Sequence, residues 1–275
     1  MKIMKIDLYE VNNLSRESGR EGYLTVMGDK PNNKDVAVLI IAGGGYDHVS
    51  VREQFPVSNF FESVGYKTFV LHYTPKLPYP VAFCEAAMAM KYIRDNFAAF
   101  GIDPDKIVGI GFSAGAHLLG TLALKHDVSE LNGIGSFDNA DAEQTVIPSA
   151  IIMCYPVILS EGKYAHKGSF KWLLNGVNRP IDEFSLEKYV KKNSPPCFIW
   201  HTFTDASVPV FNSLKLAEAY AEKGAECTLR VYAKGRHGLS VATDEVCSKQ
   251  DLAEMSADVP EWKKSCLDWL SEIGF

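Results

Sequence analysis

Several features that assign chains to common protein classes are missing from this sequence. No run reaches 18 uninterrupted apolar residues, so no membrane span is predicted. Basic side chains are in the minority, with 28 Lys and Arg against 34 Asp and Glu, and the net charge of −6 argues against a nucleic-acid partner. The six cysteines are scattered with no C-x-x-C pair, which indicates reduced, mostly buried thiols.

Targeting and repeat signals are missing as well. Residues 1–11 alternate charged and apolar side chains and lack the apolar segment of an export signal, so we expect a cytoplasmic protein. No repeat of 20–50 residues and no long biased tract occurs. A chain of 275 residues can bury about 75% of its unfolded surface, so we expect one domain over residues 1–275. A homo-oligomer is left open.

Short apolar runs alternate with helical patterns after residue 35, which is typical of βαβ units and a mostly parallel sheet. Helical periodicity runs from Phe83 to Phe97 and from Trp262 to Ile273, while Ile3–Val11 and Tyr23–Met27 indicate antiparallel edge strands. The predicted buried strands are Val36–Ala42, Lys67–His72, Ile107–Phe112, Ala150–Tyr155, Phe198–His201 and Cys227–Val231.

Two stretches interrupt this alternation. Lys125–Pro148 is polar, and Glu161–Pro196 carries aromatic residues without a strand pattern. Long excursions in a compact domain are usually functional. We therefore expect residues 161–196 to form a small cap-like insertion near the active site. Its aromatic side chains have two equal interpretations, a pocket wall or packing of the insertion onto the sheet; they are Tyr164, Phe170, Trp172, Phe184 and Tyr189.

The segment from Gly109 to His117 follows a predicted strand and opens a helix predicted over Ala114–Lys125. Gly111-x-Ser113-x-Gly115 matches a nucleophile elbow, in which small neighbours let the chain turn sharply and expose the serine oxygen. The overlapping Gly109-x-Gly111-x-x-Ala114 matches a dinucleotide fingerprint, the basis of an alternative nucleotide-binding oxidoreductase. That fingerprint requires an acidic residue at the tip of a following strand, and Asp127 and Glu130 lie in a polar stretch instead.

A nucleophilic serine needs a base and an acid to orient that base. Asp205 follows the predicted strand Phe198–His201, and His237 follows the strand Cys227–Val231. These positions lie beyond the carboxyl ends of parallel strands, where ligands bind in open α/β sheets. Ser113, Asp205 and His237 are therefore the predicted catalytic residues, and the alternative acids are Asp138, Asp141 and Glu245.

Three consecutive glycines, Gly43 to Gly45, follow the predicted strand Val36–Ala42. Such a run allows backbone N–H groups to point at one spot, as stabilising an oxyanion requires. The predicted donors are the amides of Gly44, Gly45 and Ala114.

Four further side chains are expected near the substrate. They are Tyr46, His48, His117 and Trp172, although His117 also suits a packed position. His201 and Asp205 have no third ligand at metal spacing and no H-E-x-x-H motif occurs, so we expect neither a metal nor a cofactor.

Taken together, these motifs resemble those of the α/β-hydrolase esterases, and most closely a group of acetyl-esterase-like and sugar-ester hydrolases often labelled xylanase- or lipase-like. The resemblance spans nearly the whole chain and is carried by Ala42–Tyr46, Gly101–Ile107, Gly111–His117, Asp205 with Val208–Val210 and Asn212–Ser213, and Gly235–Gly238. The sequence departs from the lipase-type H-G-G-G motif at Ala42, where that motif has histidine, which leaves the donor pair less defined.

The resemblance implies an α/β-hydrolase fold with helices on both faces of a mostly parallel sheet. It also implies a serine hydrolase that cleaves small carboxylic esters, with short acyl groups such as acetyl on sugars or other small alcohols. The partner is then a small-molecule ester, with neither nucleic acid nor membrane. An amidase or peptidase using the same residues is the alternative within this class.

Overall fold

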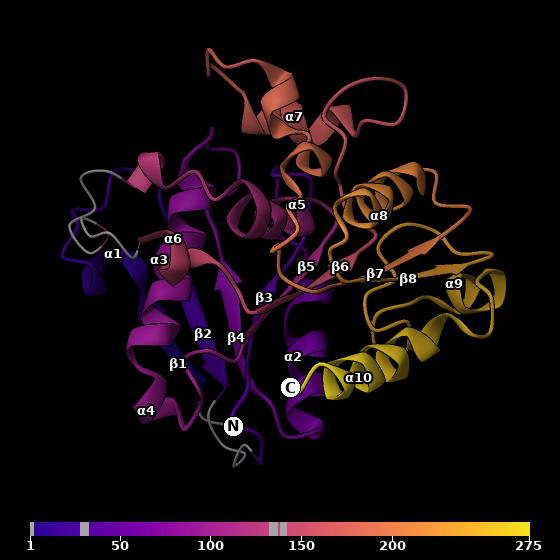
Figure 1. Cartoon of the computed structure of the whole chain (residues 1–275), viewed down its shortest axis with the longest axis horizontal. Coiled ribbons are helices and arrows are strands. Elements are labelled where there is room, and N and C mark those ends of the chain that lie inside the picture. Colours follow the sequence, from indigo (N-terminus) through magenta and orange to yellow (C-terminus); the bar gives the residue numbers. More distant parts are fainter. Residues whose placement is uncertain (1–2, 28–32, 132–136, 138–141) are drawn as a thin grey trace.

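A central eight-stranded sheet organises the chain (Figure 1). The structure is a computed structural model and describes residues 3–27, 33–131, 137 and 142–275. The strand order is β1-β2-β4-β3-β5-β6-β7-β8, in which β2 is antiparallel to both of its neighbours, β1 and β4, and all other neighbouring strands are parallel. The strands are β1 (Ile3–Asp7), β2 (Tyr23–Met27), β3 (Ala37–Ile41), β4 (Lys67–His72), β5 (Ile107–Phe112), β6 (Ala150–Cys154), β7 (Cys197–Thr202) and β8 (Cys227–Tyr232).

The central strands are covered on both faces, which explains their continuous apolar runs. Every residue of β3, β5, β6 and β7 is buried, and all six predicted core strands are present with ends shifted by at most one residue. The α/β-hydrolase architecture predicted from the sequence is confirmed.

Helices pack on both faces of this sheet (Figure 1). One core cluster joins α3, α5 and α8 to the sheet, and the other joins α2 and α10 to it. The helices are α1 (Leu8–Val11), α2 (Phe55–Ser63), α3 (Val81–Asp95), α4 (Phe97–Phe100), α5 (Ala114–Gly120), α6 (Ala142–Val146), α7 (Lys167–Leu173), α8 (Phe211–Lys223), α9 (Lys249–Glu254) and α10 (Trp262–Glu272). Among the described residues, no helix combines the length and apolarity needed to cross a membrane.

The first strand is shorter than predicted, because the expected strand Ile3–Val11 turns into helix α1 after Asp7. The Asp7 carboxylate accepts hydrogen bonds from the N–H groups of Tyr9 and Glu10, at 3.0 and 3.2 Å, and so caps the helix. The predicted helix Ala114–Lys125 also changes character. It is α-helical to Gly120 and continues as a π-helical turn over Thr121–Lys125.

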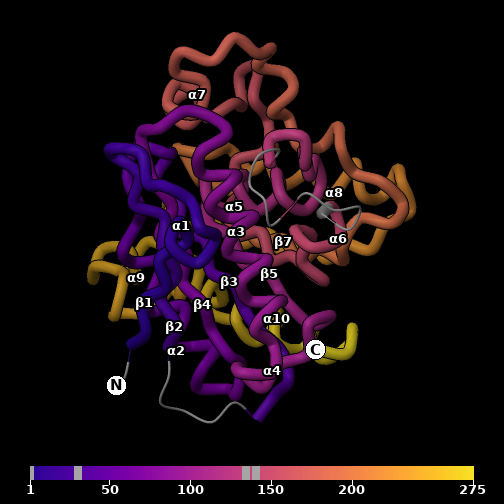
Figure 2. The backbone as a smooth tube through the Cα atoms, turned by 90° about the vertical axis from the view of Figure 1, so that its left-hand side faces the viewer, coloured from indigo at the N-terminus to yellow at the C-terminus, as the bar shows by residue number. Residues whose placement is uncertain are grey.

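Both irregular stretches lie outside the sheet. The first contains a 3-10 turn (Val128–Leu131) and α6, while the second contains α7 and two 3-10 turns (Ile181–Phe184 and Leu186–Tyr189). Helix α7 lies at the end of the molecule opposite the carboxyl terminus (Figures 1 and 2). Arg179 fastens the two stretches together, since its guanidinium lies 2.5 Å from Glu130 and 3.2 Å from Asp127.

Candidate active site

Ser113 occupies a sharp turn between β5 and α5. Its backbone has φ 53° and ψ −119°, a sparsely populated conformation for a residue with a side chain. The flanking glycines permit this turn. A Cβ on Gly111 would lie 2.5 Å from Ala116 Cα, and one on Gly115 would lie 2.2 Å from the carbonyl oxygen of Ile41. The serine hydroxyl is thereby presented at the carboxyl end of the sheet.

His237 connects Ser113 to Asp205 through both ring nitrogens. Nε2 lies 2.8 Å from Ser113 Oγ, and Nδ1 lies 2.6 Å from Asp205 Oδ2. The three residues come from loops after β5, β7 and β8, which end at the same edge of the sheet. The arrangement holds the imidazole with one nitrogen on the acid and the other on the hydroxyl, which suits proton transfer.

The carboxylate of Asp205 is buried and fully partnered. Its Oδ1 accepts the N–H groups of Ser207 and Val208, each at 2.9 Å, and its Oδ2 lies 3.3 Å from His201 Nε2. Burial by itself raises the pKa of Asp205, but the hydrogen bonds from His201, His237 and the backbone outweigh it and lower the pKa. Asp205 is thus held as a carboxylate facing His237.

Of the alternative acids, Glu245 does not occupy this position. Glu245 is exposed on the surface after the His237 loop, and Asp138 and Asp141 lie outside the described residues.

The glycine run forms a tight loop beside Ser113. The carbonyl of Gly44 accepts the N–H groups of Asp47 and His48, and Gly44 itself has φ 121°. Gly43 donates its N–H to Glu53, at 2.8 Å. Within the described part of the chain, the N–H groups of Gly44, Gly45 and Ala114 donate to no protein acceptor. Three donors therefore remain for a ligand near the serine.

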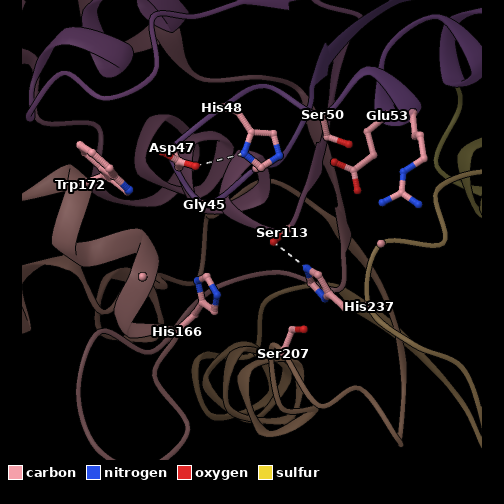
Figure 3. A pocket seen from close by; sticks show the side chains of 14 residues that line it. Gly45, Asp47, His48, Ser50, Glu53, Ser113, His166, Trp172, Ser207 and His237 are labelled. Carbon is pink, nitrogen blue, oxygen red and sulfur yellow. Dashed lines mark hydrogen bonds and ion pairs between the residues drawn. The ribbon is translucent and has the colours of Figure 1, made fainter.

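A pocket of about 340 Å³ opens over the serine (Figure 3). Its walls come from the glycine loop and the residues after it, from the 161–196 stretch, and from the loops after β7 and β8. The lining residues are Gly44, Gly45, Asp47, His48, Ser50, Arg52, Glu53, Ser113, His166, Gly168, Trp172, Ser207, His237 and Gly238.

Two of the four expected substrate neighbours line this pocket, and two do not. His48 and Trp172 lie on its wall. The prediction is wrong for Tyr46 and His117, which are 2% and 0% exposed. The Tyr46 hydroxyl lies 2.9 Å from His117 Nδ1, and His117 Nε2 donates to the carbonyl of Phe184 at 2.9 Å. The two side chains are therefore bonded to each other in the interior of the protein and do not face the pocket.

The aromatic residues of the 161–196 stretch divide between the two interpretations. Phe170 and Phe184 are buried in the core, Tyr189 packs against it, and Tyr164 stacks on Phe211 with ring centroids 3.9 Å apart. Only Trp172 of these five reaches the pocket. The stretch is therefore mainly packed onto the body, and it offers one aromatic side chain to a ligand.

The sequence interpretation missed His166, which faces the pocket from the start of α7 (Figure 3). Its Nδ1 lies 2.8 Å from Ser169 Oγ and accepts the Ser169 N–H, which caps the helix. Burial, together with the nearby His237, lowers the pKa of His166. The only local sequence signal was a histidine three residues before a serine. Ser207 and Glu53 were missed as well, because no motif includes them.

The glycines of the dinucleotide fingerprint serve packing here. A Cβ on Gly109 would lie 2.3 Å from Leu119 Cδ1, so this glycine allows α5 to approach β5 closely. Asp127 and Glu130, the acids nearest the required spacing, bind Arg179 instead. Among the described residues, no group of three or more His, Cys, Asp or Glu side chains is arranged to hold a metal ion.

The fold is that of the α/β-hydrolases, and comparisons with known proteins place the chain in the same class. The BD-FAE family model matches residues 26–220, about seven tenths of the chain, and the chain belongs to this family. The matched segment includes Ser113 and Asp205, and His237 lies beyond it.

Curated relatives and a solved structure agree with this class. The chain is 38% identical to endo-1,4-beta-xylanase B of Butyrivibrio fibrisolvens over 82% of its length and 36% of the xylanase. It is 26% identical to an acetylxylan esterase of Xylanibacter ruminicola, over 93% of this chain and 52% of that protein. This chain thus spans about half or less of these two curated relatives. A crystal structure of an acetyl ester-xyloside bifunctional hydrolase from Caldicellulosiruptor lactoaceticus superposes with a TM-score of 0.80 and 32% identity, over 99% of this chain and 97% of that one.

Proposed function

We propose that this protein hydrolyses short-chain carboxylic esters, such as acetyl esters of sugars, through an acyl-enzyme on Ser113. The observation that carries the proposal is the hydrogen-bonded series from Ser113 Oγ to His237 and on to Asp205, with distances of 2.8 and 2.6 Å, at the base of an open pocket.

In this mechanism His237 Nε2 takes the proton of Ser113 as Oγ attacks the ester carbonyl. The resulting oxyanion accepts hydrogen bonds from the N–H groups of Gly44, Gly45 and Ala114. His237 then gives its proton to the leaving alcohol, and water repeats the sequence on the acyl-enzyme. Asp205 holds the imidazole orientation and stabilises its charged form.

The substrate class rests on the pocket and on the relatives. A pocket of about 340 Å³ suits a compact ester. Its polar side chains, such as Asp47 and His48, suit an alcohol with hydroxyl groups, and Trp172 offers a face for a sugar ring. Relatives named as an acetylxylan esterase and an acetyl ester-xyloside hydrolase support an acetylated sugar as the substrate.

The test compares the native protein with Ser113→Ala on chromogenic esters of graded acyl length and on acetylated xylose. We expect acetyl and propionyl esters to react faster than octanoyl esters, acetate to be released from the sugar, and Ser113→Ala to abolish all turnover without loss of cooperative unfolding. A serine-directed phosphonate should add its mass at Ser113 alone. Full turnover by Ser113→Ala contradicts the mechanism, and a preference for octanoyl esters contradicts the substrate class.

A further inference from the structure

A buried carboxylate that belongs to none of the sequence motifs lies at the edge of the candidate site. Glu53 follows the glycine loop and is 4% exposed, yet it lines the pocket (Figure 3). Its two oxygens have different partners. Oε2 accepts the N–H of Gly43 at 2.8 Å, and Oε1 accepts the hydroxyl of Tyr155 at 2.7 Å. One side chain is therefore bonded both to the glycine loop and to Tyr155, the residue that directly follows β6.

The bond to Gly43 bears on the anion donors. Gly43 packs directly against the elbow, since a Cβ there would lie 2.6 Å from the carbonyl oxygen of Phe112 and 2.9 Å from Ser113 Cβ. Because Glu53 takes the Gly43 N–H, that peptide is fixed, and the next two N–H groups, of Gly44 and Gly45, stay free for a ligand. Small displacements matter at such donors, because a misplacement of about 1 Å can cost about a hundredfold in rate.

The bond to Tyr155 bears on the base. The Tyr155 ring meets the His237 ring edge to face, with centroids 5.0 Å apart and an angle of 71° between the rings. Its hydroxyl also accepts the N–H of Ser240, at 3.0 Å, in the loop that carries His237. The Ser240 hydroxyl in turn donates to the carbonyl of Arg52, the neighbour of Glu53, at 2.7 Å. The His237 loop is thus tied twice to the segment around Glu53.

We infer that Glu53 is a positioning residue for ester hydrolysis. Through its two bonds it fixes the anion donors of the glycine loop and the ring of His237 at set positions relative to each other. The inference rests on the proposed function. It explains how a chain with Ala42 before its glycines still holds the loop, because the anchor comes from ten residues further along the chain. A carboxylate suits the role, since it offers two acceptors to donors on opposite sides.

Three variants separate the two bonds. Glu53→Ala removes both, and we expect kcat to fall about a hundredfold while KM changes less than about threefold. Glu53→Gln keeps an oxygen for Gly43 but no second acceptor for Tyr155, and Tyr155→Phe removes only the hydroxyl. These two variants should behave alike, each with kcat about tenfold lower. If Glu53→Ala does not fold, these two variants carry the test.

A matched control is another buried carboxylate, Glu85, which is 0% exposed and also binds a backbone N–H and a tyrosine hydroxyl, those of Thr74 and Tyr9. It does not line the pocket. Glu85→Gln should lower the melting temperature and leave kcat unchanged. If Glu53→Gln behaves in the same way, Glu53 is merely structural and the inference is wrong.

A double-variant cycle tests whether Glu53 and Tyr155 position the site through their mutual hydrogen bond. Tyr155→Phe should lower kcat less in the Glu53→Ala background than in the native protein, because its bond to Glu53 is already gone. If the effects of the two substitutions on kcat are fully additive, Glu53 and Tyr155 act independently and the inference is wrong. The Ser113→Ala result keeps the two proposals apart: an inactive Ser113→Ala with fully active Glu53 variants refutes only this inference, whereas an active Ser113→Ala refutes the proposed function.

Discussion

The Nε2 atom of His237 lies 2.8 Å from the Oγ atom of Ser113, although 124 positions separate the two residues in the chain. Both follow strands of the same parallel sheet, whose carboxyl ends share one edge. Asp205 lies between these two residues in the sequence, and its carboxylate contacts Nδ1, the other ring nitrogen of His237. The sheet topology thus converts three distant loops into one continuous hydrogen-bonded series.

This series predicts steep losses of activity. His237→Ala is expected to lower kcat by about a thousandfold or more, because removing one member of such a series removes most of the contribution of all three. Asp205→Asn should also lose most of its rate, since an amide presents the wrong hydrogen-bonding group to the imidazole. Steady-state kinetics on an acetyl ester measures both. Glu245→Gln is the control, because Glu245 is exposed and Asp205 occupies the position beside His237. A normal rate in Asp205→Asn would show that another group orients His237.

The glycine loop predicts a separate effect on the transition state. A Cβ on Gly44 would lie 2.1 Å from the His48 carbonyl oxygen, so Gly44→Ala must displace the loop. We expect kcat to fall about a hundredfold, the value of one oxyanion donor, with a smaller change in KM. The control is Gly224→Ala, since Gly224 also has positive φ, at 64°, but has open space around it. It should lose only stability. A change confined to KM for Gly44→Ala would indicate that the loop shapes substrate binding instead.

Trp172 predicts selectivity for the alcohol part of the ester. Trp172→Ala should lower kcat/KM unequally across esters that share an acetyl group and differ in the alcohol, because a pocket contact discriminates between transition states. Tyr164→Ala is the matched control from the same stretch, because Tyr164 stacks on Phe211 and does not line the pocket. It should change all substrates equally. An equal loss on every alcohol in Trp172→Ala would mean that the tryptophan only packs the stretch.

His117 predicts a pH dependence of stability. Burial lowers the pKa of His117 to about 4, from the ordinary value of 6.5. The unfolded chain therefore binds the extra proton first, so the free energy of unfolding falls as the pH drops from 6.5 towards 4. This group should account for about 2 kcal/mol of the fall between pH 7 and pH 5.

Urea unfolding of His117→Gln at both pH values measures this contribution. The variant should show a flatter pH dependence than the native protein. Burial also lowers the pKa of His72 to about 4, so some dependence remains. His72→Gln should remove a smaller share, because that ring is partly exposed to solvent. An unchanged slope in His117→Gln would contradict the assignment.

Local sequence patterns determined the sheet and the positions of the three residues in the series. Continuous apolar runs mark strands covered on both faces, and the ends of β4 and β5 agree with the predicted ones. The elbow at Ser113 was predictable because a sharp strand-to-helix turn admits only small neighbours. Asp205 and His237 followed from their places after predicted strands. These signals are local, so a single sequence can carry them.

Only the tertiary structure decided which side chains face the pocket. Tyr46 and His48 are two residues apart, yet Tyr46 is buried against His117 while His48 lines the cavity. His166 and Glu53 reach the site from segments that carry no motif. The direction of a loop side chain depends on contacts with residues distant in sequence, which no local periodicity encodes. Loops have neither the 3.6-residue nor the 2-residue repeat that reveals a buried face, so their side-chain directions emerge only when the sheet brings them together.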